Sequence, residues 1–183
     1  MTHENLVKAL KKPGDQILQS LTAKNISLLK IIFNEFVNYN KVFDHIKKHV
    51  IYNKDLQINI DDHINDEEGE EILKTLDAEK ASLLHMAMLI FGEAGEILDA
   101  VKKHVIDNEP LDLENVIEEI GDLKFGIEGL IQDLNLDHED CIEANIKKLS
   151  IRYGDSYSDE SAQKRKDKET GFKFLSENQQ SSS

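Results

Sequence analysis

The sequence contains a partial internal repeat at a spacing of 55 residues, and this repeat limits the folds open to the chain. Lys-Lys-His-Val-Ile at 47–51 recurs at 102–106, and Ser-Leu-Leu at 27–29 recurs at 82–84, in one register and without a gap. Scattered leucines can coincide by chance, whereas two such segments in one register indicate a partial tandem duplication. Each copy has the pattern of a short helix, a turn and a long helix, so we expect an all-α fold.

Local start and stop signals define the expected helices. Asp77 is a residue type that caps helix N-termini, and Pro110 cannot continue a helix and restricts the residue before it. Two prolines, nine glycines and 6% aromatic residues are too few of each for a typical β-sandwich. The long helices are expected at 24–51, 78–106, 113–134 and 138–150, and a short polar helix is expected after Gly154.

Charge and composition limit the binding partners and the cellular compartment that we expect for this chain. A formal net charge of -14 disfavours binding to a nucleic-acid backbone, but it does not exclude a small polyphosphate that is bound through metal ions. The single Cys141 cannot form an intrachain disulfide, which fits a reducing compartment. The N-terminal residues lack an apolar core, and no apolar run approaches the length of a membrane span, so we expect a cytoplasmic protein without a membrane partner.

Two pairs of acidic residues give the sharpest chemical signal. Glu93 and Glu96 form one pair, Glu119 and Asp122 form the other, and each pair has i,i+3 spacing on a predicted helix. Both pairs flank an apolar stripe in the same sense, so antiparallel packing through the stripes would bring all four carboxylates together. The first stripe is Met86, Ile90, Ala94, Ile97 and Val101, and the second is Val116, Ile120, Leu123, Ile127 and Leu130.

Four clustered carboxylates repel one another unless a cation lies between them. Oxygen ligands select a hard cation, and Mg²⁺ favours a few carboxylates together with waters and substrate phosphates. One such pair in a chain with 36 acidic residues is usually a solvated helix face, but two pairs with matching geometry favour a metal site. Gly95 and Gly121, one inside each pair, are costly in a helix and indicate close approach of a neighbouring helix or of a ligand.

These residues resemble a known family. The arrangement ExxE, a spacer of a couple of dozen residues and ExxD resembles the MazG-like all-α nucleoside triphosphate pyrophosphohydrolases, over about residues 73–168. The segment from Asn145 to Tyr153 is similar to the closing NxxKLxxRY segment of that family. The stretch from Gly154 to Lys168 is similar to the tail of phage-type members.

The resemblance implies a fold, an activity and a set of site residues. The fold is a helical bundle of the all-α nucleoside triphosphate pyrophosphatase type, here with a partial N-terminal tandem repeat. The activity is Mg²⁺-dependent hydrolysis of a (deoxy)nucleoside triphosphate to the monophosphate and pyrophosphate, with Mn²⁺ as a substitute ion, in a homodimer or homotetramer. The metal ligands carried over are Glu93, Glu96, Glu119 and Asp122, and the substrate-binding residues are Asn145, Lys148, Arg152 and Tyr153.

Two further roles rest on chemistry and helical geometry. A carboxylate that is not fully committed to metal can take the proton of the attacking water, and we assign this role to Glu96. Lys103 lies near the same helical face as Glu96, two turns further on, so we expect it to bind a β or γ phosphate. Lys102 points to the far side of the helix.

The first copy has lost the acidic pattern. Asn38 and Lys41 stand at the positions that match Glu93 and Glu96, so the first copy is not a second active site. We expect it to pack as a bundle helix that a partner subunit supplies in simpler relatives. The predicted segments are a half-repeat for packing or oligomerisation at 1–66, the catalytic domain at 67–153, a polar helix at 154–169 and a disordered tail at 170–183.

Two other functions remain open from the sequence. One is a phosphohydrolase restricted to dUTP or dCTP, or to a signalling nucleotide, because base preference depends on pocket walls that the sequence does not place. The other is a nucleotide-binding or interaction module without turnover, although all four acidic residues are present in the second copy.

Overall fold

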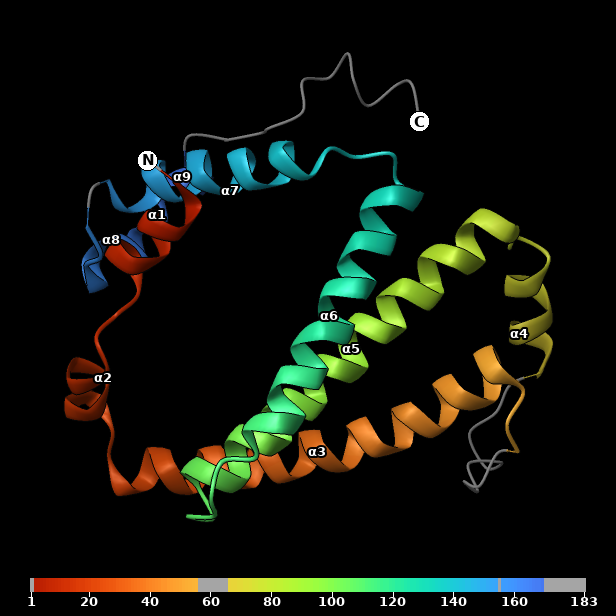
Figure 1. Cartoon of the computed structure of the whole chain (residues 1–183), viewed down its shortest axis with the longest axis horizontal. Helices are drawn as coiled ribbons and strands as arrows, with labels where there is room; N and C mark the ends of the chain where they lie inside the picture. The colour runs from red at the N-terminus through yellow and green to blue at the C-terminus, as the bar shows by residue number, and fades with distance from the viewer. Residues whose placement is uncertain (1, 56–65, 155, 170–183) are drawn as a thin grey trace. The chain divides into compact units, whose positions relative to one another are not determined.

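The computed structural model describes residues 2–55, 66–154 and 156–169, and its regular elements are all α-helices within these ranges (Figure 1). The all-α prediction is therefore confirmed. The predicted disordered tail lies outside the described residues. The helices are α1 (His3–Leu10), α2 (Gly14–Ser20), α3 (Ala23–Tyr52), α4 (Asp66–Leu73), α5 (Ala78–Val105), α6 (Leu113–Asp133), α7 (His138–Tyr153), α8 (Asp159–Lys164) and α9 (Lys166–Glu169).

The chain divides into two compact units. The first comprises Met1–Leu21 and Leu136–Ser183, and the second comprises Thr22–Asn135 with helices α3 to α6. All four predicted metal ligands lie in the second unit, which is therefore described in more detail. The predicted division of the chain into segments 1–66, 67–153, 154–169 and 170–183 stays a prediction.

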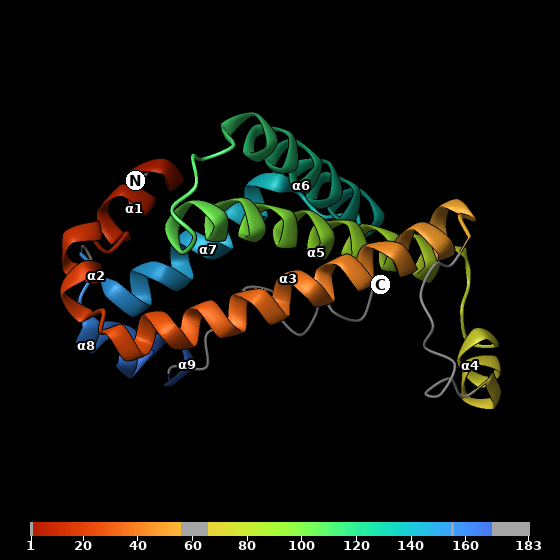
Figure 2. The same ribbon diagram turned by 90° about the horizontal axis from the view of Figure 1, so that it is seen from below.

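In the second unit α5 is the central helix, with α3 on one side and α6 on the other (Figure 2). The helix α3 runs antiparallel to α5, because Asn40 bonds to Gly92 whereas the later residue Tyr52 contacts the earlier residue His85. The rings of Phe43 and Phe91 also pack edge to face between these helices, with centroids 4.7 Å apart. Aromatic pairs in this arrangement add to the stabilisation from buried apolar area.

The ends of α3 and α5 are alike at positions 55 residues apart. Thr22 caps α3 and Asp77 caps α5, each by accepting a hydrogen bond from the backbone N–H three residues later. The left-handed residues Asn53 and Asn108 follow the two helices with φ of 52° and 58°. The ring nitrogens of His49 and His104 donate to the carbonyl oxygens of Lys54 and Glu109, at 2.6 and 2.8 Å. These matching ends agree with the predicted repeat, which stays a prediction.

The contact between α5 and α6 depends on glycines. A Cβ at Gly126 would lie 2.6 Å from Leu89 Cδ2, and one at Gly129 would lie 2.3 Å from Met86 Sδ. The absence of side chains at these glycines lets the two helices approach closely, and the order of the contacts makes them antiparallel, as expected. The predicted apolar stripe of α6 was partly wrong, however, because Ile120 and Ile127 are 42% and 40% exposed.

One helix within the described ranges, α5, is long and apolar enough to cross a membrane by length and composition alone. It also carries the buried carboxylate of Glu93 and packs against two neighbouring helices. This finding differs from the sequence expectation that no apolar run approaches the length of a membrane span.

The first unit has its own small core and its own polar contacts. Leu6 of α1 is fully buried, and α7 packs against α1, α8 and α9. The guanidinium of Arg152 donates two hydrogen bonds to the carboxylate of Asp167, both of 2.7 Å. This pairing lowers the pKa of Asp167 to about 2.

A carboxylate cluster beside a pocket

Three of the four predicted metal ligands form a tight cluster. Glu93 and Glu96 are one turn apart on α5, and Glu119 faces them from α6. One carboxylate oxygen of each residue lies within 4.8 Å of the others. Glu93 and Glu119 are only 8% and 6% exposed, and Glu96 is partly buried. Carboxylates are placed in this way at a helix interface only if a proton or a cation offsets their repulsion.

The cluster holds a proton when no cation is bound. Burial raises the pKa of Glu119, and its contacts with Glu93 and Glu96 raise it further, to about 8. Protonated Glu119 can then donate a hydrogen bond to a neighbouring carboxylate at neutral pH. A divalent ion would take the place of this proton.

The structure separates Asp122 from the other three acids. Asp122 lies on α6, one turn beyond Glu119, but its side chain is exposed and does not belong to the cluster.

The two glycines inside the acidic motifs differ in their surroundings. Gly95 lies against a neighbouring helix, as expected, because a Cβ there would lie 2.2 Å from Asn40 Cγ on α3. At Gly121, by contrast, no described atom lies within 4 Å of an added Cβ, so the expected helix contact is not found there.

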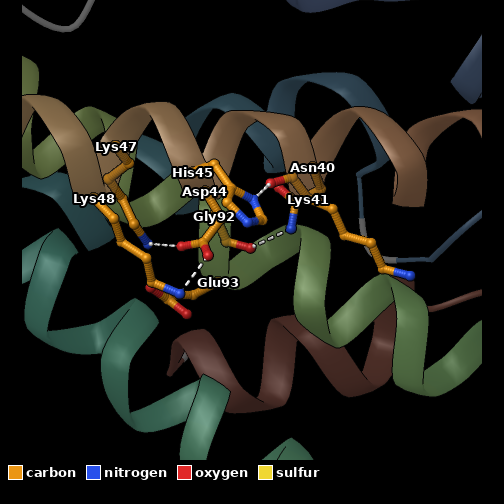
Figure 3. A network of polar contacts seen from close by, with 8 residues as sticks. All are labelled: Asn40, Lys41, Asp44, His45, Lys47, Lys48, Gly92 and Glu93. Carbon is orange, nitrogen blue, oxygen red and sulfur yellow. Dashed lines mark hydrogen bonds and ion pairs between the residues drawn. The ribbon is translucent and has the colours of Figure 1, made fainter. Parts of the chain in front are cut away.

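A lysine that the sequence analysis did not single out also reaches the cluster (Figure 3). Lys47 of α3 is 5% exposed, and its Nζ lies 3.1 Å from Glu93 Oε1 and 3.4 Å from Asp44 Oδ1. Burial lowers the pKa of Lys47, but its contacts with Glu93 and Asp44 outweigh this effect, and the net pKa is raised. Lys47 therefore stays charged inside the helix interface. In the sequence, the only feature that drew attention to Lys47 was the Lys-Lys-His-Val-Ile segment at 47–51, which recurs at 102–106.

Asn40 of α3 fixes the same interface from the other side of the cluster. Its Nδ2 donates to the carbonyl oxygen of Gly92 at 3.1 Å, as Figure 3 shows. Its Oδ1 is buried and has no hydrogen-bond partner in the part of the chain that the structure describes. A buried amide oxygen without a partner is costly, so this atom marks a place where a ligand or water can bind.

A pocket of about 610 Å³ lies between α3, α5 and the connection that follows α5. Glu96 lines this pocket and also belongs to the carboxylate cluster, so the two features are continuous. Two ion pairs at positions 55 residues apart line it, Asp44 with Lys48 from α3 and Asp99 with Lys103 from α5. The remaining lining residues are Val37, Asn40, Lys41, His45, Gly95, Ala100, Glu109, Pro110, Asp112 and Asn115.

The predicted phosphate ligand Lys103 lines this pocket. Its hydrogen bond with Asp99, at 2.8 Å, raises its pKa, so the ammonium is charged at neutral pH. Lys102, which the sequence placed on the far side of the helix, pairs with Asp107 at 2.9 Å and does not line the pocket.

The other predicted substrate residues lie on α7 in the first unit. Asn145 Oδ1 is 3.3 Å from the ring Nε2 of His3, and Lys148 is partly buried. Arg152 is paired with Asp167, and the ring of Tyr153 packs on that of Tyr157 with centroids 5.6 Å apart. Substrate binding by these four residues stays a prediction.

The donor set of the cluster fits a hard divalent cation. Three carboxylate oxygens from three residues lie close enough to share one ion, and oxygen ligands are those that Mg²⁺ and Mn²⁺ favour. The pKa of Glu119 is raised by burial and by the neighbouring carboxyl groups of Glu93 and Glu96, as expected where negative charges are crowded. The residues present therefore fit the predicted metal.

The helices and this cluster define an all-α protein with a buried carboxylate cluster beside a pocket. Residues 81–155, somewhat less than half of the chain, match the family model of the MazG nucleotide pyrophosphohydrolase domain. This segment is therefore similar to the family that the acidic motifs indicated. No curated protein and no solved structure matches the chain.

The family match gives the general chemistry of the domain. The matched family is that of nucleotide pyrophosphohydrolases, which hydrolyse anhydride bonds, and it generally depends on a divalent metal. The match includes α6 and nearly all of α5, and therefore all three clustered carboxylates. It does not include α3, which supplies Lys47, Asn40 and one wall of the pocket.

Proposed function

We propose that the protein hydrolyses (deoxy)nucleoside triphosphates between the α and β phosphates, in a Mg²⁺-dependent reaction that gives the monophosphate and pyrophosphate. The observation that carries this proposal is the cluster of Glu93, Glu96 and Glu119, which adjoins the pocket through Glu96. The family match supports the general activity.

Glu93, Glu96 and Glu119 would hold the ion. Asp122, the fourth predicted ligand, lies outside the cluster and would join it only by a change in its side-chain conformation. When bound, a divalent ion neutralises phosphate charge and lowers the pKa of a water molecule that it binds. Mn²⁺ serves as a substitute because it prefers similar oxygen ligands.

The chain's own side chains have distinct roles in this proposal. Glu96 faces the pocket and takes the proton of the attacking water, whereas Glu93 and Glu119 are more deeply buried. Lys103 binds a β or γ phosphate from the same pocket wall. Asn145, Lys148, Arg152 and Tyr153 bind the triphosphate or the sugar, a role supported only by their resemblance to the family's closing segment.

We further propose a cytoplasmic homodimer or homotetramer. Large apolar side chains on α6 are exposed in the single chain, with Phe125 at 65% and Ile117 at 64%. A second copy of the chain would cover such side chains.

A phosphate-release assay across a panel of nucleotides with Mg²⁺ tests the function. We expect free phosphate to appear only when inorganic pyrophosphatase is added, because the first product is pyrophosphate. Turnover of only dUTP, dCTP or a signalling nucleotide would favour the restricted enzyme instead. Binding without turnover of any nucleotide would favour a non-catalytic module and contradict the proposal.

A further inference from the structure

Lys47 is an unusual neighbour for a divalent-metal site. Its ammonium lies 3.1 Å from Glu93 Oε1, and its side chain is 6% exposed, so little solvent screens the contact. The backbone of α5 leaves room for it, because a Cβ at Gly92 would lie only 3.0 Å from Lys47 Nζ. The cation is therefore built into the interface between α3 and α5.

Comparison with the matching residue of the predicted repeat indicates that this contact is specific to Lys47. Lys102 is the residue that matches Lys47, and the residue that matches Glu93 is Asn38, which has no charge. Lys102 pairs instead with Asp107 at 2.9 Å. Each lysine has an acidic partner, but only Lys47 has one within the carboxylate cluster.

The charge of Lys47 must influence ion binding at the cluster. A positive charge beside Glu93 reduces the negative potential that attracts a divalent ion, and the effect is large where the surroundings are buried. Lys47 also occupies one oxygen of Glu93. Asp44, which shares Lys47 with Glu93, is paired in addition with Lys48 and offsets this effect only in part.

We propose that Lys47 is a built-in counter-cation of the carboxylate cluster and lowers its affinity for divalent ions. The proposal rests on the metal site of the proposed function and extends it, because α3 lies outside the segment that matches the family. Lys47 is a positioning residue in this role, since it acts on the ion through Glu93.

Titration of the full-length protein with Mn²⁺ alone, followed by electron paramagnetic resonance of the free ion, tests the proposal. We expect Lys47→Met to bind Mn²⁺ at least about tenfold more tightly than the unchanged protein, because a repulsive charge is gone. The matched control Lys102→Met removes an equivalent lysine away from the cluster and should leave the affinity unchanged. Lys47→Arg, which keeps the charge, should also remain close to the unchanged protein.

Thermal unfolding with and without Mn²⁺ separates this role from a structural one. We expect Lys47→Met to be destabilised without the ion and to gain more from saturating Mn²⁺ than the unchanged protein does. If Lys47→Met is too unstable to isolate, Lys47→Gln provides the uncharged variant, since its amide can still donate to Glu93. Equal or weaker Mn²⁺ binding by the uncharged variant would overturn the proposal.

The same titration distinguishes this failure from failure of the metal site. If the unchanged protein bound no Mn²⁺, or if Glu119→Gln bound it equally well, the metal site itself would be refuted. If the unchanged protein bound Mn²⁺ and Glu119→Gln bound it more weakly, but Lys47→Met had the same Mn²⁺ affinity as the unchanged protein, only the role of Lys47 would be refuted.

Discussion

The protonation of Glu119 depends strongly on its surroundings. It is 6% exposed, and burial together with the neighbouring Glu93 and Glu96 raises its pKa from 4.5 to about 8. The same carboxyl group in the unfolded chain would titrate near 4.5. Between these two pKa values the carboxyl group of Glu119 is mostly protonated in the folded chain and mostly ionised in the unfolded chain.

This difference predicts how the stability of the metal-free protein changes with pH. Between about pH 4.5 and 8 the folded state binds more protons than the unfolded state, so its stability falls as the pH rises. The Glu119 contribution is complete below this range and lost above it. Thermal midpoints in a metal chelator should fall by several degrees across the range, and Glu119→Gln should flatten the profile. A profile that Glu119→Gln does not alter would contradict the assignment.

The same residue provides a sharp test of catalysis. Glu119→Gln removes a charged ligand from the cluster, so we expect turnover with Mg²⁺ to fall at least about a hundredfold. Glu118→Gln is the matched control, because Glu118 is the exposed neighbour on α6 and should retain full activity. Steady-state kinetics on the best substrate of the panel measure both. Equal losses in the two variants would show that the cluster is not the catalytic site.

At the scale of elements, α5 must accept close neighbours on two sides. Gly95 faces α3, and Gly126 and Gly129 of α6 let that helix approach α5 from the other side. These contacts bring Lys47 and Glu119 to the same acidic residue of α5, Glu93. Small residues at the helix contacts are therefore part of what forms the site.

The two glycines of the acidic motifs should respond in opposite ways to alanine. In Gly95→Ala the new Cβ would lie 2.2 Å from Asn40 Cγ, so overpacking of about 1–3 kcal/mol should outweigh a gain of about 1 kcal/mol in helix propensity. In Gly121→Ala the described structure leaves the space open, so the propensity gain should remain. Thermal unfolding of the metal-free variants measures both. Destabilisation of Gly121→Ala and stabilisation of Gly95→Ala would contradict the helix arrangement.

The helix boundaries could be predicted from local chemistry. The Asp77 cap and the break before Pro110 placed α5 within one residue of its observed end, because these signals act over a single turn. The three clustered carboxylates were also predicted, since i,i+3 spacing fixes which side chains share a helix face. The face of α6 in contact with α5 was predicted less well. Glycines contribute nothing to an apolar pattern, yet Gly126 and Gly129 determine where the helices meet.

Lys47 and the pocket could not be predicted in the same way. Their positions depend on how α3 packs against α5, and the sequence of either helix alone does not specify that packing. The ion pair between Lys47 and Glu93 joins residues 46 positions apart. A helical pattern shows which face a lysine occupies, but not which acid it will meet.

At the scale of the whole molecule, the part of the chain that forms the pocket is larger than the part that matches the family. The matched segment begins at residue 81, whereas the second compact unit begins at Thr22 and includes α3. The helix α3 provides Asn40, Asp44 and Lys48 to the pocket. We therefore predict that α3 is needed both for stability and for the pocket.

Removal of residues 1–66 tests that role. We expect the shortened chain to be less stable and more prone to self-association, because the face of α5 that packs against α3 would be uncovered. Analytical ultracentrifugation and thermal unfolding measure these changes against the full chain. A truncated protein with unchanged activity, stability and oligomeric state would show that α3 is dispensable.

The most direct test of the metal site is a crystal structure with Mn²⁺ and a triphosphate analogue that resists cleavage between the α and β phosphates. Anomalous scattering from Mn²⁺ locates the ion without reference to the protein. We predict a peak within about 2.5 Å of carboxylate oxygens of Glu93, Glu96 and Glu119, with the analogue's phosphates against the ion and its remainder in the pocket beside Glu96. A peak elsewhere, with the three carboxylates bound to neither ion nor analogue, would contradict the account.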